Sequence, residues 1–236
     1  MKPGETSIKI IAVIPCLNEE KFIGNVVSKA KKYVDAAIVV DDGSSDDTVN
    51  VSRASGAEVI LHPIRQGAGS ATRTGFDAAL KDGADIVVTL DGDGQHDADE
   101  IPLLVHPIKE GEADIVIGSR FLRKAQVPRY RKFGIDVITW LYNLGFKEKI
   151  IDAQSGFRAY SRKAIGVIEI TDVGFGFSIQ TLVQVRKHGL KIIEVPVSCI
   201  YHDSGSTMNP LIHGLNVALA VLRIRTKEEF FKHGKS

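Results

Sequence analysis

The chain has few cysteines and no long apolar run. Its two cysteines, Cys16 and Cys199, lie far apart in the 236 residues and form no paired motif. Isolated thiols argue against a disulfide framework and favour a reducing, cytoplasmic location. No run approaches the ~20 apolar residues that span a bilayer. The apolar run near the N-terminus is short and contains Pro15, so we expect no cleavable signal peptide there.

An excess of one charge is also missing. Lys and Arg number 30 and Asp and Glu number 29, which gives a formal net charge of +1. This balance gives no reason to expect a nucleic-acid partner. Hydrophobic residues make up 44% of the chain, enough for one large domain with an extended core. Because no repeat, low-complexity segment or linker divides it, we expect a single domain over residues 1–236.

What the sequence does contain is a regular alternation of two patterns. Continuous runs rich in β-branched residues predict strands that are covered on both faces, at 8–15, 36–42, 57–62, 84–91, 113–120 and 191–201. Segments of helical length, such as 19–33 and 68–82, lie between them, and Ser44 and Ser45 indicate a further helix N-terminus. The alternation predicts an α/β fold with a doubly wound, mostly parallel sheet and helices on both faces.

Three polar clusters follow the predicted strands. Residues 18–20 follow the first strand, 41–44 the second and 91–93 the fourth. Ligands of open α/β sheets bind beyond the carboxyl ends of the strands. We therefore expect these clusters to share one edge of the sheet and to form the functional site.

The segment DGDGQHD at 91–97 allows four interpretations. A calcium-binding EF-hand loop fails, because His96 and Pro102 stand where Gly and Glu are needed. Gln95 disfavours a phosphatase with an Asp nucleophile, and a solvated turn is the third interpretation. The fourth is a Mg²⁺ or Mn²⁺ ion that bridges nucleotide phosphates, since these ions prefer carboxylate and phosphate oxygens. The neighbouring polar clusters favour this last interpretation.

Five motifs occur in order: AVIPCLNEE, VVDDGSSDDT, VTLDGDGQHD, DIVIGSR and DAQSGFRAYSR. Together they resemble the family 2 glycosyltransferases of GT-A fold, in particular the dolichol-phosphate mannose synthase-like branch of polyprenyl-phosphate sugar transferases. The resemblance covers residues 8–200. It implies a UDP- or GDP-linked sugar donor, a divalent cation, and transfer with inversion at the anomeric carbon.

The resemblance also implies roles for individual residues. The nucleotide-contacting positions are matched by Pro15, Asn18, Glu19, Asp42 and Asp91, and the metal and diphosphate positions by Asp91, Asp93 and Gln95. Positions near the transferred phosphate and sugar are matched by Arg120, Ser155 and Arg158. The expected catalytic residues are Asp91, Asp93, Arg120 and Arg158. We expect a nucleotide-sugar-binding half over 8–120, an acceptor half over 121–203, and a helical tail over 204–236.

The chain departs from the family's usual motifs at three places. Arg65 stands where relatives often have Asn before two glycines, and we expect it to contact donor phosphate. Gln180 stands where relatives often carry Glu. The segment QVPRY at 126–130 only resembles the Q-x-x-R-W of polymer-making relatives, which argues against processive polysaccharide synthesis.

Two interpretations of the acceptor stay open. A lipid phosphate is mostly ionised at neutral pH, because its second pKa is about 6, and needs cations rather than a base. The basic run FLRKAQVPRYRK supplies them, and the expected acceptor-phosphate residues are Arg120, Arg129, Arg131 and Ser155. The run could equally be a solvated basic loop. A sugar or protein hydroxyl acceptor would instead need a base, for which Asp152 or Asp172 is the candidate.

The last residues leave the partners open. The apolar segment 211–225 predicts either a core or dimer-interface helix or a helix that lies in the membrane interface. We therefore expect a protein that is peripheral at the cytoplasmic membrane face, as a homo-oligomer or with a separate membrane subunit. A non-catalytic nucleotide-sugar-binding subunit is disfavoured by the intact Asp91 and Asp93. The residues His96, His202 and His213 have no ligand spacing and are expected to be ordinary polar or packing residues.

Overall fold

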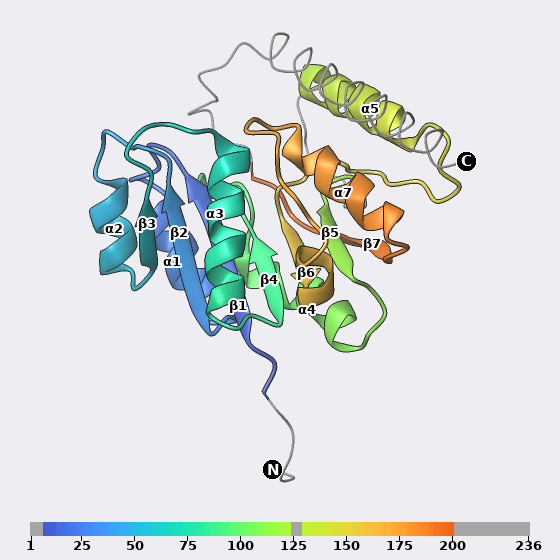
Figure 1. Cartoon of the computed structure of the whole chain (residues 1–236). Helices are drawn as coiled ribbons and strands as arrows, with labels where there is room; N and C mark the ends of the chain where they lie inside the picture. Colours follow the sequence, from blue (N-terminus) through green and yellow to red (C-terminus); the bar gives the residue numbers. More distant parts are fainter. Residues whose placement is uncertain (1–6, 124–128, 201–236) are drawn as a thin grey trace.

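One sheet organises the chain (Figure 1), whose computed structural model describes residues 7–123 and 129–200, without the side chains of 129–131. The strands are β1 (Ile10–Cys16), β2 (Ala36–Asp41), β3 (Glu58–Leu61), β4 (Ile86–Thr89), β5 (Ile115–Ser119), β6 (Arg158–Ser161) and β7 (Ile192–Pro196). Their order is β3-β2-β1-β4-β6-β5-β7. Only β6 runs against its neighbours β4 and β5, so the sheet is mostly parallel, as predicted.

Helices cover both faces of this sheet. They are α1 (Ile23–Ala30), α2 (Thr48–Ala54), α3 (Ala68–Lys81), α4 (Ile101–Lys109), α5 (Arg129–Asn143), α6 (Arg162–Ile165) and α7 (Phe177–Lys187). The helices α1, α2 and α4 pack on one face, and α3, α5, α6 and α7 pack on the other (Figure 1). Within the described ranges, no helix has the length and apolar character that crossing a membrane requires.

The core consists of two layers, one on each side of the sheet. Along β1, Ile11 and Val13 pack toward α3, whereas Ile10, Ala12 and Ile14 pack toward α1 and α4. Side chains of a strand alternate between its faces, so burial of both faces requires a continuous apolar run. This explains why the parallel strands could be predicted from the sequence.

The sequence misses one strand and places the start of one helix too early. The strand β6 was not predicted, because its four residues, RAYS, form no β-branched run. The helix indicated by Ser44 and Ser45 is present but begins after them: α2 begins at Thr48, whose backbone N–H donates to Asp46 Oδ1 at 3.1 Å. Ser44 Oγ donates to the carboxylate of Asp41 at the end of β2, and the N–H of Ser45 donates to Asn18 Oδ1 on the loop after β1.

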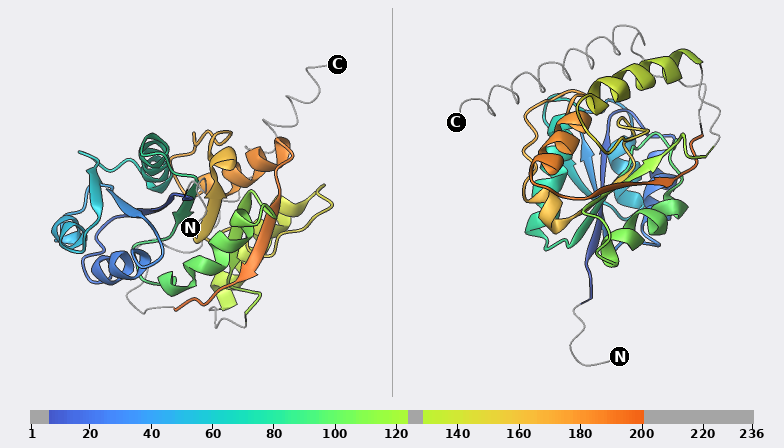
Figure 2. Two further views of the ribbon diagram at one scale, coloured as in Figure 1. Left: turned by 90° about the horizontal axis from the view of Figure 1, so that it is seen from below. Right: turned by 90° about the vertical axis from the view of Figure 1, so that its right-hand side faces the viewer.

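The strand order reverses between β1 and β4. Chain order runs outward from β1 through β2 to β3, and β4 then pairs with the other side of β1. At such a switch point the loops after the two strands diverge and leave a crevice for ligands. The carboxyl ends of the parallel strands lie at the top of Figure 1, the same end at which α5 lies in Figures 1 and 2.

The start of α3 touches the loop before α7 through the main chain. The N–H of Gly69 donates to the carbonyl oxygen of Val173 at 3.0 Å. A Cβ atom at Gly69 would lie 2.0 Å from the carbonyl oxygen of Asp172, and one at Gly67 would lie 2.2 Å from that of Val173. The two glycines are therefore required by this close approach.

Replacement of Gly69 tests this contact. Gly69→Ala should lower the free energy of unfolding by about 1–3 kcal/mol, because the backbone at Asp172 must move to make room. Gly134→Ala is the matched control: it lies in α5, and an added Cβ there meets nothing within 4 Å. The control should raise stability by about 0.5–1 kcal/mol, as expected of Gly to Ala in a helix. Urea unfolding measures both, and equal stability of Gly69→Ala and wild type would contradict the contact.

Candidate active site

The loops after β1 and β2 are cross-linked at the switch point. The backbone N–H of Asn18 donates to Ser44 Oγ, and Asn18 Oδ1 accepts from the N–H of Ser45, both at 2.8 Å. Asn18 has a positive φ of 58°, which Asn tolerates better than most residues. Glu19 follows, and its N–H donates to Thr48 Oγ1 at 2.7 Å. These bonds hold Asn18 and Glu19 at the switch point, where Pro15 lies near the end of β1 and where the sequence predicts nucleotide contacts.

Asp42 is buried and bound to the chain itself. Its two carboxylate oxygens accept from the N–H groups of Gln66 and Gly67 at 2.8 Å, and Oδ1 also lies 2.8 Å from His62 Nδ1. His62 Nε2 in turn lies 3.0 Å from Thr74 Oγ1 on α3. The carboxylate thus holds the loop 62–67 against the end of β2. Its predicted contact with the nucleotide stays a prediction, and the observed role is to position this loop.

The acidic turn follows β4, next to β1. Asp93 accepts twice from Gln95, from the backbone N–H at 2.9 Å and from Nε2 at 2.7 Å. Gly92 lies against β1, since a Cβ there would be 3.0 Å from the Cβ of Cys16. Gln95, predicted at the metal site, therefore orients Asp93, and Gly92 allows the turn to approach β1.

Negative charge accumulates around this turn. The pKa of Glu19 is raised to about 7 by burial and by the nearby carboxylates of Asp93, Asp91 and Asp46. Among the residues that the structure describes, no three His, Cys, Asp or Glu side chains are placed to hold a metal ion by themselves. Two carboxylates that require further oxygens from a substrate are nevertheless a common Mg²⁺ arrangement. The residues present thus fit a divalent cation that is held jointly with a diphosphate.

The titration of Glu19 gives a testable pH dependence. The metal-free folded protein keeps this proton up to about pH 7, whereas the unfolded chain releases it near the ordinary value of 4.5. The native state then binds more protons between these values, so stability falls as the pH rises through them. Glu19→Gln removes the charge and should stabilise the protein more at pH 8 than at pH 5.

Urea unfolding at both pH values, in the presence of a chelator, measures this difference. Glu112→Gln, on an exposed turn, serves as the matched control. An equal effect of Glu19→Gln at pH 5 and pH 8 would show that Glu19 does not carry the raised pKa.

Arg120 and Asp152 form a bidentate ion pair. Arg120 Nε and Nη2 donate to the two oxygens of Asp152 at 2.8 and 2.7 Å, and the backbone N–H of Arg120 adds a third bond at 3.1 Å. The Asp152 side chain is fully buried. Glu194 accepts from the N–H groups of Ile151 and Asp152 at 2.7 and 2.8 Å and so holds this segment. Asp152 is therefore a partner of Arg120, and this pairing argues against its predicted alternative role as a base.

Arg158 lies in the interior, contrary to a direct catalytic role. Its exposed fraction is 1%, and it donates to the carbonyl oxygens of Ala153 and Ser178 at 2.7 and 2.8 Å. Ser155 is also fully buried, and its Oγ accepts from the N–H of Phe157 at 3.3 Å. Both line a small cavity of about 20 Å³ that Asp91 lines as well. They position the segment behind the acidic turn, and burial keeps them from a bulky acceptor.

Gln180 and Asp172 organise the loop before α7. Gln180 Oε1 accepts from the N–H groups of Thr171 and Asp172 at 3.0 and 3.2 Å. The amide thus shapes the loop that contacts α3. Asp172 is partly exposed, with Oδ1 accepting from the N–H of Gly174 at 2.9 Å. Asp172 remains the candidate base for a hydroxyl acceptor.

The remaining sequence expectations divide into three groups. Arg65 is exposed on the loop that Asp42 holds, beside Gly43. His96 packs, as expected, with its ring centroid 5.3 Å from that of Phe157, and burial lowers its pKa to about 4. The side chains of Arg129 and Arg131, most of QVPRY, and the segment 201–236 with His202 and His213 lie outside the described residues.

Sequence reasoning missed three supporting residues. They are His62 beneath Asp42, Glu194 beside Asp152, and Glu100, which accepts from the backbone N–H of Ser198 at 2.7 Å. Only His62 carried a signal, because it is the polar last residue of a predicted strand. The partners of Glu100 and Glu194 lie far away in sequence, and nothing in the local pattern indicates them.

Measurements of stability show whether Asp152 stabilises the fold by pairing with Arg120 or acts as a catalytic base. Removal of one member of a buried ion pair costs about 3–5 kcal/mol, so Asp152→Asn should destabilise the fold by about that amount. The double variant Arg120→Met/Asp152→Asn should cost less than the sum of the two single variants, because the residues interact directly. Urea unfolding gives all three values. A fully stable Asp152→Asn protein that lacks only turnover would instead identify a base.

With this geometry in view, comparison with known proteins decides the family. The sequence model of the family described as glycosyl transferase family 2 matches residues 11–168. The chain belongs to this family. A UDP-N-acetylglucosamine–dolichyl-phosphate N-acetylglucosaminyltransferase of Methanococcus voltae is 33% identical over 220 residues, which cover 82% of this chain and 86% of that protein. An undecaprenyl-phosphate mannosyltransferase of Micrococcus luteus is 28% identical over 217 residues, covering 85% and 87%.

The solved structures agree with the family. Glucosyl-3-phosphoglycerate synthase of Mycobacterium tuberculosis, in complex with Mn²⁺, UDP and glucosyl-3-phosphoglycerate, superposes with a TM-score of 0.76 at 27% identity. The match covers 95% of this chain and 85% of that one. The predicted GT-A fold is thus confirmed, and the protein is a glycosyltransferase. The relatives named for polyprenyl phosphates also bear out the resemblance to that branch of the family.

Proposed function

We propose that this glycosyltransferase moves one sugar from a UDP- or GDP-linked donor to a polyprenyl phosphate such as dolichyl phosphate, with a divalent cation and inversion at the anomeric carbon. The observation that carries the proposal is the pair Asp91 and Asp93 at the switch point, surrounded by further negative charge. Two relatives named for polyprenyl-phosphate acceptors support the choice of acceptor.

The donor side uses residues from three loops. Asp91 and Asp93 would hold Mg²⁺ or Mn²⁺ together with the donor diphosphate, and Gln95 keeps Asp93 oriented. The bound cation would neutralise the charge that develops on the departing diphosphate. Asp42 holds the loop that carries Arg65, and the bonds of Asn18 keep the loops after β1 and β2 together. These residues would orient the nucleotide before transfer.

The acceptor side favours an anion over a hydroxyl. A lipid phosphate needs no base, because its second pKa of about 6 leaves it mostly ionised at neutral pH. Asp152 is already bound to Arg120, which leaves the partly exposed Asp172 as the candidate base that the structure offers. The sequence places Arg129 and Arg131 in the first turn of α5, after the GSR motif. An acceptor phosphate paired with this basic segment would place the enzyme at the cytoplasmic membrane face.

The metal assignment predicts the behaviour of Asp93→Asn. This variant should keep the fold, because its side chain lies on a turn outside the core, but should lose sugar transfer by about 10²–10³-fold, as when one stabiliser of developing charge is removed. Transfer in saturating Mn²⁺ and binding of Mn²⁺ by calorimetry measure the effect. Asp77→Asn, on the exposed side of α3, is the matched control. Full turnover by Asp93→Asn, or by wild type in excess chelator, would overturn the metal site.

The acceptor is tested by competing substrates. Transfer from UDP- and GDP-sugars is measured with polyprenyl phosphate, phosphoglyceric acid and simple sugars as acceptors, and products are identified by mass spectrometry. With polyprenyl phosphate, Arg129→Ala and Arg131→Ala should each lower kcat/KM roughly 10- to 150-fold, because charge-assisted bonds to phosphate are lost. Asp172→Asn should change it little. Loss of transfer in Asp172→Asn, with both arginine variants near wild type, would identify a hydroxyl acceptor.

A further inference from the structure

Helix α5 has two apolar faces. The inward face consists of Ile135, Ile138 and Tyr142, which are 9%, 2% and 0% exposed and belong to the core. A surface helix needs only this one apolar stripe. The side chains on the opposite face would ordinarily be polar.

The outward face of α5 is apolar as well. Its members are Phe133, Val137, Trp140 and Leu144, with exposed fractions of 71%, 37%, 60% and 39%. Leu144 continues the helical path, since its N–H donates to the carbonyl oxygen of Trp140 at 3.2 Å. At 3.6 residues per turn the four side chains fall within about 60° of one another on the helix surface. We call these four residues the outer stripe.

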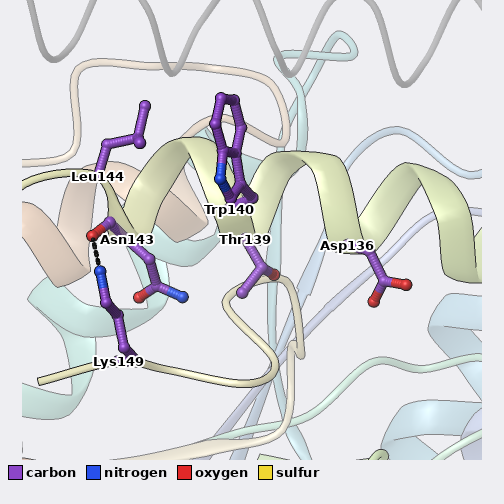
Figure 3. Close-up of a pocket in the computed structure, with 6 residues that line it drawn as sticks. All are labelled: Asp136, Thr139, Trp140, Asn143, Leu144 and Lys149. Carbon is purple, nitrogen blue, oxygen red and sulfur yellow. Dashed lines mark hydrogen bonds between the residues drawn. The ribbon is translucent and has the colours of Figure 1, made fainter.

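Figure 3 shows this geometry for part of the helix. Trp140 and Leu144 project from one side of α5, while Thr139 and Asn143 point to the other. A hollow of about 270 Å³ lies beside the stripe, and Asn143 and Lys149 are among the residues that line it. Lys149 Nζ donates to the carbonyl oxygen of Asn143 at 2.9 Å. Asp136 lines the hollow as well, so the apolar stripe borders a polar hollow that carries one acidic and one basic side chain.

The charge around the outer stripe is positive on balance, although Lys132 is paired with Asp136, Arg123 is paired with Glu100, and Glu148 lies between two lysines. The run 123–132, which leads into α5, contains Arg123, Lys124, Arg129, Arg131 and Lys132 and no acidic residue. Lys147 and Lys149 follow the helix and are exposed. Aromatic and aliphatic side chains flanked by Lys and Arg are typical of helices that lie in the interface of an anionic bilayer. There the apolar side enters the acyl boundary and the cations meet lipid phosphates.

We propose that the outer stripe of α5 is the surface by which this protein binds an anionic lipid bilayer. The outer stripe could instead be covered by the segment 211–225 of the same chain or by a second copy of the protein. Charge argues against both. The segment 211–225 of the same chain is apolar but carries Arg223 and Arg225 and no acidic residue, so it offers no partner for the cationic run. A second copy would bring the same cations to the same face. The proposal deepens the proposed function and rests on it for its role, because a polyprenyl phosphate resides in a bilayer.

The chain provides its own reporter of this surface. Trp140 is its single tryptophan, so intrinsic fluorescence reports on the outer stripe alone. The full-length protein is titrated with vesicles of phosphatidylcholine containing roughly 30% phosphatidylglycerol, an anionic surface. Emission should shift to the blue, and lipids brominated in the acyl chain should quench it. The binding should weaken between about 0.1 and 0.5 M salt, where surface charges are screened.

Two double variants distinguish vesicle binding through the outer stripe from nonspecific binding through any exposed apolar side chain. Phe133→Ser/Val137→Ser leaves the reporter in place and should weaken vesicle binding roughly tenfold or more, because buried apolar area governs such binding. Ile8→Ser/Leu103→Ser is the matched control, with two exposed apolar residues far from α5, and should bind as wild type does. Circular dichroism verifies that both variants are folded.

Three outcomes would overturn the proposal. Unchanged Trp140 emission with vesicles, together with protection from a soluble quencher in their absence, would mean that the chain itself covers the stripe. A blue shift that depends on protein concentration without vesicles would mean that a second copy covers it. Equal loss of binding in both double variants would remove the stripe as the surface. Vesicle binding without transfer to polyprenyl phosphate would refute only the proposed function, since the binding assay uses neither donor nor acceptor.

Discussion

The parallel pairing of β1 with β4 is the constraint on which the site depends. Because β2 and β3 lie on the other side of β1, the loops after β1 and β4 separate above the sheet. The acidic turn and the segment 18–20 therefore face one crevice although they lie about 70 residues apart in sequence. A different neighbour for β1 would leave Asp91 and Asp93 as a solvated turn.

Local sequence patterns were sufficient to predict the parallel strands and the polar residues that follow them. The central parallel strands β1, β2, β4 and β5 are buried on both faces, so each reads as a continuous apolar run, and the polar residues after them mark the carboxyl edge. The short strand β6 escaped prediction because it joins two neighbours in antiparallel pairing without a distinctive run of its own. The family motifs, rather than any pattern of hydrophobicity, led to the donor side of the site.

The roles of individual polar residues could not be predicted in the same way. A motif shows that a residue type recurs, but not whether its side chain faces a ligand or the chain. Asp42 and Arg158 both lie in motifs, yet both are buried and bound to protein groups, at Gln66 and Gly67 in one case and at Ala153 in the other. Gln66 and Gly67 lie on another loop, and Arg158 also donates to the carbonyl oxygen of Ser178 on α7, so only the folded chain brings these groups into contact.

The contact between α3 and the loop before α7 has a consequence for how acceptor preference can change. Gly69 meets Asp172 and Val173 through main-chain atoms alone. The side chains at positions 172 and 173 can therefore diversify under selection without breaking the junction between α3 and the loop before α7. An insertion or deletion in this loop would displace the carbonyl groups that Gly69 contacts. Related enzymes are thus free to vary the composition of this loop, but its length is constrained.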